Sequence, residues 1–201
     1  CIRDRNNVLR SYVRKVMKPL FTIHVGEYLV GSHIEKNYPN WHVWIPSKDK
    51  GIDFLVSNYD DSKTASIQVK FSKDYVIENK NPVFKKQIVC GGWWTLNKKK
   101  LYESQADFWV MVMHSYSKKN IQYIIIPSKE LYRRQVKLHP KPKMIQTYLT
   151  VTEQKKCWET RGWNKQQFTR TLSNEIEEID EARDFSEFLK NWGPLEGKLG
   201  L

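Results

Sequence analysis

Two adjacent strand-like runs, residues 52–58 and 64–71, constrain this chain more than any other feature of its sequence. Apolar and polar residues alternate along both runs, which is the period of a β-strand with one buried face. The polar residues 59–63 between them have the composition of a turn. The pattern predicts a β-hairpin with one apolar face that packs on a helix. That face contains Ile52, Phe54, Val56, Ala65, Ile67, Val69 and Phe71.

The other face of the hairpin is polar apart from Leu55. If Asp60 and Asp61 form the turn, the numbers of opposed residues sum to 121, and Asp53 lies across from Gln68. Opposed Cβ atoms are about 4.5–5.5 Å apart, so a carboxylate and an amide would meet there, with the ammonium group of Lys70 beside them. A face of this composition is also common on hairpins without any active site. Its members are Asp53, Ser57, Ser66, Gln68 and Lys70.

A helix predicted over residues 22–37 precedes the strands and ends before Pro39. Glu27 lies within its apolar stripe. A carboxylate in such a position needs a partner, a metal ion or a place at the rim, because an unpaired buried charge is costly. A metal ion held by Asp53 would be such a partner. The stripe consists of Ile23, Val30 and Ile34.

The rest of the chain is predicted to alternate between strands and helices. The order helix, three strands, helix, strand, strand favours an α/β fold with a mixed central sheet flanked by helices. The apolar strand at 108–114 is expected at its centre, buried on both faces. Further strands are predicted at 41–45, 121–126 and 144–151, helices at 6–17, 94–104 and 128–138 with Ser128 as the cap, and loops at 72–92, 117–120 and 139–143.

These motif residues and this element order resemble the PD-(D/E)XK nuclease superfamily, the restriction-endonuclease-like proteins, over about residues 22–127. Glu27 matches the helical motif, Asp53 the second motif and Gln68–Lys70 the third. The chain differs from the usual pattern in two places. No proline precedes Asp53, and Gln68 replaces the usual Glu or Asp.

The resemblance implies an αβββαβ core and Mg²⁺-dependent hydrolysis of phosphodiester bonds. Asp53, Gln68, the Val69 carbonyl and Glu27 would hold the metal ion, because hard oxygen ligands suit Mg²⁺. Lys70 would position the attacking water and stabilise the developing charge.

Charge is unevenly distributed along the chain. The net charge is +12, yet residues 173–196 hold eight acidic and two basic residues, which leaves +17 on residues 1–172. A basic body of this kind favours a polyanion such as DNA, because each neutralised phosphate releases counterions. A generally basic protein without such a partner is the alternative. The acidic segment is predicted to be a solvated helix or, alternatively, a mask over the basic groove.

Two smaller features bear on DNA binding. Lys98, Lys99 and Lys100 are predicted to contact phosphates or to form a solvated helix face. Trp93 and Trp94 are predicted to belong to the core or, alternatively, to stack on bases. The five histidines are scattered without the spacing of a metal site.

The three cysteines are odd in number and include no CxxC pair, which argues against a zinc site and a disulfide framework and favours a reducing, cytoplasmic compartment. No run approaches the ~20 apolar residues of a membrane span. Residues 1–18 do not have the pattern of a signal peptide. The chain starts at Cys1 rather than at methionine, so an upstream segment is left open.

We therefore expect one nuclease domain over residues 1–201, with a core at 22–127 and a C-terminal extension at 128–201. The expected activity is that of a Mg²⁺-dependent DNA endonuclease, restriction-type and site-selective. One active site in each core suggests a homodimer for cutting both strands. The alternatives are a homing or repair endonuclease, a binding module whose catalytic site has decayed at Gln68, and an RNA-directed enzyme.

Overall fold

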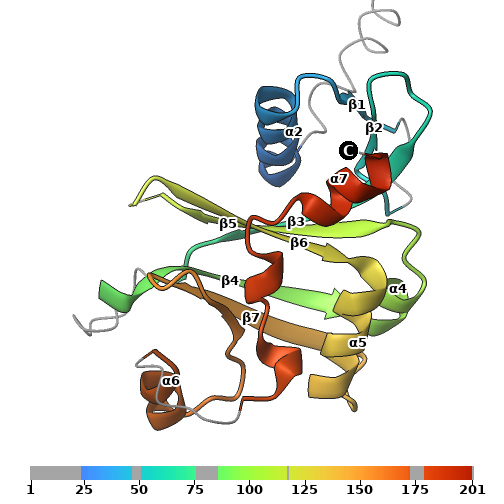
Figure 1. Cartoon of the computed structure of the whole chain (residues 1–201). Helices are drawn as coiled ribbons and strands as arrows, with labels where there is room; N and C mark the ends of the chain where they lie inside the picture. Colours follow the sequence, from blue (N-terminus) through green and yellow to red (C-terminus); the bar gives the residue numbers. More distant parts are fainter. Residues whose placement is uncertain (1–23, 47–50, 76–85, 117, 173–178, 201) are drawn as a thin grey trace, which may run out of the picture.

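Two β-sheets form the framework of the protein. The computed structural model describes residues 24–46, 51–75, 86–116, 118–172 and 179–200 (Figure 1). The larger sheet has the order β1 (His42–Trp44), β2 (Phe54–Ser57), β3 (Thr64–Lys73), β5 (Phe108–Ser115) and β6 (Asn120–Pro127). The smaller sheet has the order β4 (Ile88–Asn97), β7 (Met144–Thr152) and β8 (Cys157–Glu159).

The larger sheet is mixed, because β3 and β5 run parallel and its other pairs are antiparallel. The predicted α/β class with a mixed central sheet is thereby confirmed. The described helices are α2 (Val25–Asn37), α4 (Lys98–Tyr102), α5 (Ser128–Leu138), α6 (Lys165–Leu172) and α7 (Gly193–Leu199). None of these helices is long and apolar enough to cross a membrane. The helix predicted at 6–17 lies outside the described residues.

The two faces of the larger sheet are covered differently. Helices α2 and α7 pack on one face, and the smaller sheet lies against the other (Figure 1). The prediction of flanking helices therefore holds fully for one face, while on the other face helix α5 shares the cover with the smaller sheet. On the helix-covered face, six of the seven apolar hairpin residues pack in one core with Val30 and Ile34 of α2. Ile52 was assigned wrongly, because it packs in the core between the two sheets.

The hairpin has the predicted register. The pairs Phe54 with Ile67 and Ser57 with Thr64 both sum to 121. A positive φ of 57° at Asp61 turns the chain, and the carboxylate of Asp60 accepts a hydrogen bond from the Ser62 amide at 3.2 Å. The polar turn residues therefore set the strand pairing, as their types predicted.

Residues 88–97 form strand β4, so the loop predicted up to residue 92 and the helix predicted from residue 94 were wrong there. Only residues 98–102 are helical, as α4. The misleading signal was Gly92, which sits where the two sheets approach closely. A Cβ on Gly92 would lie 2.5 Å from Trp94 Cη2 and 2.6 Å from Met113 Cγ. Glycine here permits close packing and does not mark a loop.

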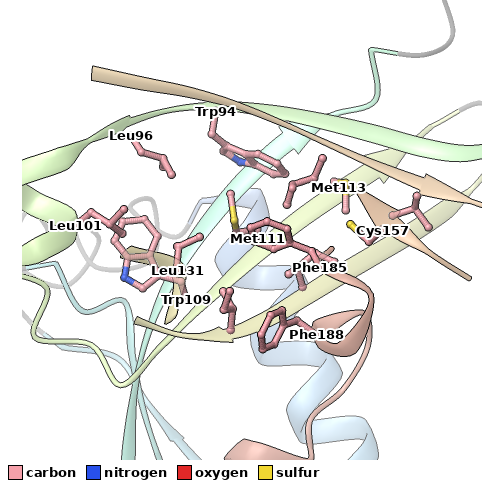
Figure 2. Packing of buried hydrophobic residues seen from close by; sticks show 14 of the residues in the cluster. Trp94, Leu96, Leu101, Trp109, Met111, Met113, Leu131, Cys157, Phe185 and Phe188 are labelled. Atoms are coloured by element: carbon pink, nitrogen blue, oxygen red, sulfur yellow. The ribbon is translucent and has the colours of Figure 1, made fainter. Parts of the chain in front are cut away.

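Figure 2 shows the core between the two sheets. All residues from Phe108 to Met113 of β5 are buried, which confirms the central position predicted for this strand. Trp94 belongs to this core and is 5% exposed, whereas its neighbour Trp93 is 48% exposed. Cys90 and Cys157 are also buried in this core as free thiols.

The C-terminal residues are part of the same packing. The acidic segment 173–196 was predicted to be helical; its described part forms two 3₁₀ turns, η2 (Glu181–Arg183) and η3 (Ser186–Phe188), and only its last residues are α-helical, as the start of α7. The acidic residues of the two 3₁₀ turns pair with α5, where the guanidinium of Arg134 contacts Glu187 at 2.6 Å. Ser128 does not cap α5 as predicted, because its hydroxyl donates to the Ala106 carbonyl.

Candidate active site

An open edge of β3 creates the candidate site. Strand β2 begins at Phe54, opposite Ile67, and among the described strands none pairs with the following residues of β3 on that side. Side chains from both faces of the sheet can reach this edge. It lies within a cleft of about 830 Å³ whose lining includes Glu27, Asp53, Gln68, Val69 and Lys70.

Asp53 directly precedes β2, and two donors from β3 hold its carboxylate. Its Oδ2 atom accepts hydrogen bonds from the Val69 amide at 2.7 Å and from Nε2 of Gln68. The Asp53 amide donates to the Ile67 carbonyl at 2.8 Å. The sequence prediction that Asp53 and Gln68 meet therefore matches the geometry.

Gln68 is 7% exposed, and its amide nitrogen faces Asp53. Its oxygen Oε1 lies toward Gly51, where an added Cβ would be 3.5 Å away. A rotation of the Gln68 side-chain amide by half a turn would bring its Oε1 atom, in place of Nε2, to the Asp53 carboxylate. Two oxygens that face each other repel unless a cation lies between them, so the amide orientation depends on whether the site holds a positive ion.

Lys70 lies on the same face of β3 as Gln68. Its Nζ is placed 5.6 Å from the centre of the Trp109 ring, which provides a cation–π contact. Trp109 is on β5 directly beside Gln68, and its indole nitrogen donates to Ser104 Oγ at 3.0 Å. The Trp109 ring thus forms the wall against which Lys70 rests.

Glu27 reaches the same cleft from the first turn of α2. Gly26 permits this approach, because a Cβ there would lie only 2.8 Å from Phe71 Cβ. Burial raises the pKa of the Glu27 carboxyl, and the negative charge of Asp53 raises it further. The hydrogen bond from the His24 amide, at 3.3 Å, and the charge of Lys70 lower it.

The hydrogen bond with His24 gives Glu27 a structural role as well. A glutamate at the third helical position that accepts from the N-cap amide forms half of a capping box. Glu27 therefore stabilises the start of α2 and also contributes charge to the cleft.

The remaining polar residues of the hairpin face are used in structural contacts. The hydroxyl of Ser57 accepts a hydrogen bond from the Trp44 indole at 2.9 Å. The hydroxyl of Ser66 donates to Asp107 at 2.8 Å. Only Asp53, Gln68 and Lys70 of this face line the cleft.

The three lysines of α4 have different surroundings. Lys100 lines the cleft. Lys98 donates from Nζ to the Pro140 carbonyl at 2.6 Å, and Lys99 lies 3.8 Å from Glu103. Of the three residues predicted to bind nucleic acid, one therefore faces the candidate site directly.

Several cleft residues had not been identified from the sequence. Apart from Gly51, which directly precedes the hairpin, they come from segments distant from it, and the prediction of a helix from residue 94 concealed the start of α4. The sequence indicated only that Trp109 belongs to a buried strand. Its place beside Gln68 depends on a parallel pairing between residues 41 positions apart, which the local sequence does not indicate. The missed residues include His24, Gly51, Glu103, Ser104, Gln105 and Trp109.

The donor atoms in the cleft suit a hard cation. Carboxylate oxygens come from Asp53 and Glu27, and Gln68 can offer its amide oxygen. The Val69 carbonyl points toward the same edge as its amide, which binds Asp53, because both groups of one strand residue point to one side. Mg²⁺ prefers such oxygens and keeps several waters. The described residues contain no group of three or more His, Cys, Asp or Glu side chains placed to hold a metal ion.

Comparisons of the chain with protein-family models, with curated proteins and with solved structures found no match.

Proposed function

We propose that this protein is a Mg²⁺-dependent DNA endonuclease of the PD-(D/E)XK type. The observation that carries the proposal is the convergence of Asp53, Gln68, Lys70 and Glu27 on one cleft at the open edge of β3. These residues come from α2, from the position just before β2 and from β3, and their order along the chain matches the superfamily motifs. An ordinary polar hairpin face would not require a carboxylate from α2 at the same place.

The residues of the cleft divide the chemistry between them. Asp53, Gln68, the Val69 carbonyl and Glu27 would hold a Mg²⁺, which lowers the pKa of bound water and neutralises phosphate charge. Lys70 orients the attacking water and stabilises the negative charge that develops on the phosphate. The Trp109 ring limits the positions that the Lys70 ammonium group can occupy.

The basic body supports a polyanionic substrate. Residues 1–172 carry a net charge of +17, and Lys100 lies on the wall of the cleft. We propose that the substrate is DNA that contains a duplex. Restriction is the biological role that we favour, and homing or repair are the alternatives. A homodimer would provide one active site for each strand.

One observation favours a second candidate, a nucleic-acid-binding module without catalysis. The Gln68 amide nitrogen donates to Asp53, and Glu27 has a capping role, so both carboxylates have partners without a metal ion. In that case the protein would bind DNA and would not cut it.

Plasmid cleavage tests the proposal. We expect the purified chain to cut supercoiled plasmid DNA in Mg²⁺ and to be inactive in EDTA. Asp53→Asn should abolish cutting, because it removes the main anionic ligand and keeps the side-chain size. Asp60→Asn, an exposed position in the turn of the same hairpin, is the matched control and should cut normally. Metal-dependent cleavage that survives Asp53→Asn unchanged would show that the active site lies elsewhere.

A further inference from the structure

A second pocket shares part of its lining with the cleft, at α4. It also has a volume of about 830 Å³ and is lined by α4, α5 and residues 141–143. Five of its lining residues are lysines, and only Glu103 is acidic. We call it the lysine–tyrosine pocket; it is defined by Lys98, Lys99, Lys100, Tyr102, Tyr132, Lys141 and Lys143.

Aromatic rings line this basic pocket. Tyr102 is 70% exposed, and its ring centre lies 5.2 Å from that of Tyr132. The Tyr132 ring is half-buried against the intersheet core and backs the exposed Tyr102 ring. An exposed ring surrounded by ammonium groups suits unpaired nucleotides, because bases stack on the ring while phosphates meet the lysines. A duplex hides the faces of its bases and would leave the exposed Tyr102 ring unused.

Hydrogen bonds hold the walls of the pocket in place. The Lys98 amide donates to the Lys143 carbonyl at 2.9 Å, which ties α4 to the segment before β7. The side chain of Asn97 caps α4 by accepting from the Lys100 amide at 3.0 Å. The pocket therefore exists before a ligand binds.

Most of the ammonium groups remain available. The structure gives Lys100, Lys141 and Lys143 no ion pair with any other residue it describes. The Lys99 side chain is 80% exposed, and its distance of 3.8 Å from Glu103 is long for an ion pair. Uncompensated positive charge on a concave surface attracts a phosphate backbone.

The pocket is continuous with the candidate active site. Lys100 and Glu103 line both cavities, so a ligand in the pocket lies next to the cleft. We propose that the lysine–tyrosine pocket binds an unpaired stretch of the DNA strand next to the bond that is cleaved. This inference rests on the proposed function and makes a junction between duplex and single-stranded DNA the preferred substrate.

Binding in EDTA tests the pocket without any cleavage. We would measure fluorescence anisotropy of a labelled oligothymidylate of about twelve nucleotides, within the usual range for such sites, with the full chain. Tyr102→Ala should weaken binding about fivefold to a hundredfold, because it removes a stacking ring. Tyr102→Phe should bind as the wild type does. Equal affinity of both variants and the wild type would overturn the proposal.

The salt dependence provides an independent measurement. Each phosphate contact on a single strand contributes about 0.7 to the slope of log affinity against log salt. Lys141→Ala/Lys143→Ala should lower this slope by about 1.4, while Tyr102→Ala should leave it unchanged. Lys165→Ala/Arg170→Ala on α6 removes the same charge from two exposed positions and should leave slope and affinity unchanged. A pocket variant that behaves like this α6 control would also overturn the proposal.

Two further comparisons separate this inference from the proposed function. A flapped duplex should be cut faster than a blunt one by the wild type, and Tyr102→Ala should lose that preference. Blunt and flapped duplexes cut equally would refute the pocket while leaving the nuclease intact. A wild type that binds oligothymidylate through the pocket and never cuts would refute the nuclease alone. Tighter binding of oligouridylate than of oligothymidylate would refute DNA as the ligand.

Discussion

Strands β3 and β5 run side by side, yet the cleft and the intersheet core use them in different ways. At the cleft, Asp53 and Lys70 are half-buried and held by hydrogen bonds and a ring contact. On β5, Met111, which pairs directly with Lys70, and Met113 are fully buried beneath the smaller sheet (Figure 2). On this face of the sheet the candidate site therefore uses side chains of β3, whereas the intersheet core uses the neighbouring side chains of β5.

Trp109 marks the boundary between these two regions. It belongs to the intersheet core and is 6% exposed, while its ring also supports Lys70 in the cleft. Under the proposed function, a rigid core next to the reacting groups would hold them in place without ordering long side chains at the moment of reaction. The comparison predicts that core variants change stability, whereas cleft variants change activity.

The largest effect should come from the core. Met111→Ala removes a fully buried side chain between the sheets and should lower the free energy of unfolding by about 2–5 kcal/mol. Urea denaturation followed by circular dichroism measures this loss. Met144→Ala is the matched control, because Met144 is 49% exposed on β7, and it should change stability by less than about 0.5 kcal/mol. Equal effects of the two variants would contradict the packing of β5 described here.

Lys70→Ala should have the next largest effect, on activity alone. Loss of a group that stabilises transition-state charge slows cleavage about a hundredfold to a thousandfold, or about 2.7–4 kcal/mol. DNA affinity and the urea midpoint should stay close to those of the wild type. Lys73→Ala, an exposed position on the same strand outside the cleft, should retain full activity. If the two lysine variants cut at the same rate, Lys70 has no catalytic role.

The hairpin was predictable because its information is local. Alternation fixed the buried face, and the turn at Asp60 and Asp61 fixed the register that brings Asp53 beside Gln68. Six of the seven predicted apolar residues pack as expected. The prediction for Ile52 was wrong. Ile52 precedes the first residue of β2, where the alternation of a strand no longer decides which core a residue enters.

The second sheet was not predictable in the same way. Strand β4 pairs with β7, and Trp94 lies opposite Thr147, more than fifty residues later. Nothing near Gly92 in the sequence indicates that Met113 will pack against it. The place of Trp109 beside Gln68 likewise depends on a parallel pairing, which no local pattern specifies.

Gln68→Glu is expected to have a smaller effect and tests how the cleft differs from a decayed site. A second carboxylate beside Asp53 adds about 1–4 kcal/mol of attraction for a nearby cation, depending on the local dielectric. The Mg²⁺ concentration for half-maximal cleavage should therefore fall roughly fivefold or more. Gln146→Glu on β7 adds the same charge outside the cleft and should leave the Mg²⁺ requirement unchanged. An inactive wild type whose cleavage is restored by Gln68→Glu would instead identify a decayed nuclease.

The smallest expected effect concerns Glu27 and depends on pH. Burial and Asp53 raise the pKa of Glu27 in the folded protein above its usual value of about 4.5. Between that value and the raised pKa, the folded state binds more protons than the unfolded state, so this group's contribution to stability falls as pH rises. Glu27→Gln keeps an acceptor for the His24 amide and has no proton to lose. In EDTA the variant should therefore become more stable than the wild type as pH rises through this window.

Thermal unfolding of both proteins in EDTA across acidic and neutral pH measures the difference in stability between Glu27→Gln and the wild type. The other carboxyl groups titrate alike in both proteins, so their contributions cancel in this difference. Glu35→Gln, an exposed position on the same helix, is the control and should follow the wild type. Mg²⁺ should reduce the advantage of Glu27→Gln at neutral pH, because a bound cation favours the ionised carboxylate. A difference that shrinks as pH rises in EDTA would mean that Glu27 is stabilised in its charged form without any cation. In that case its capping role in α2 would account for this residue.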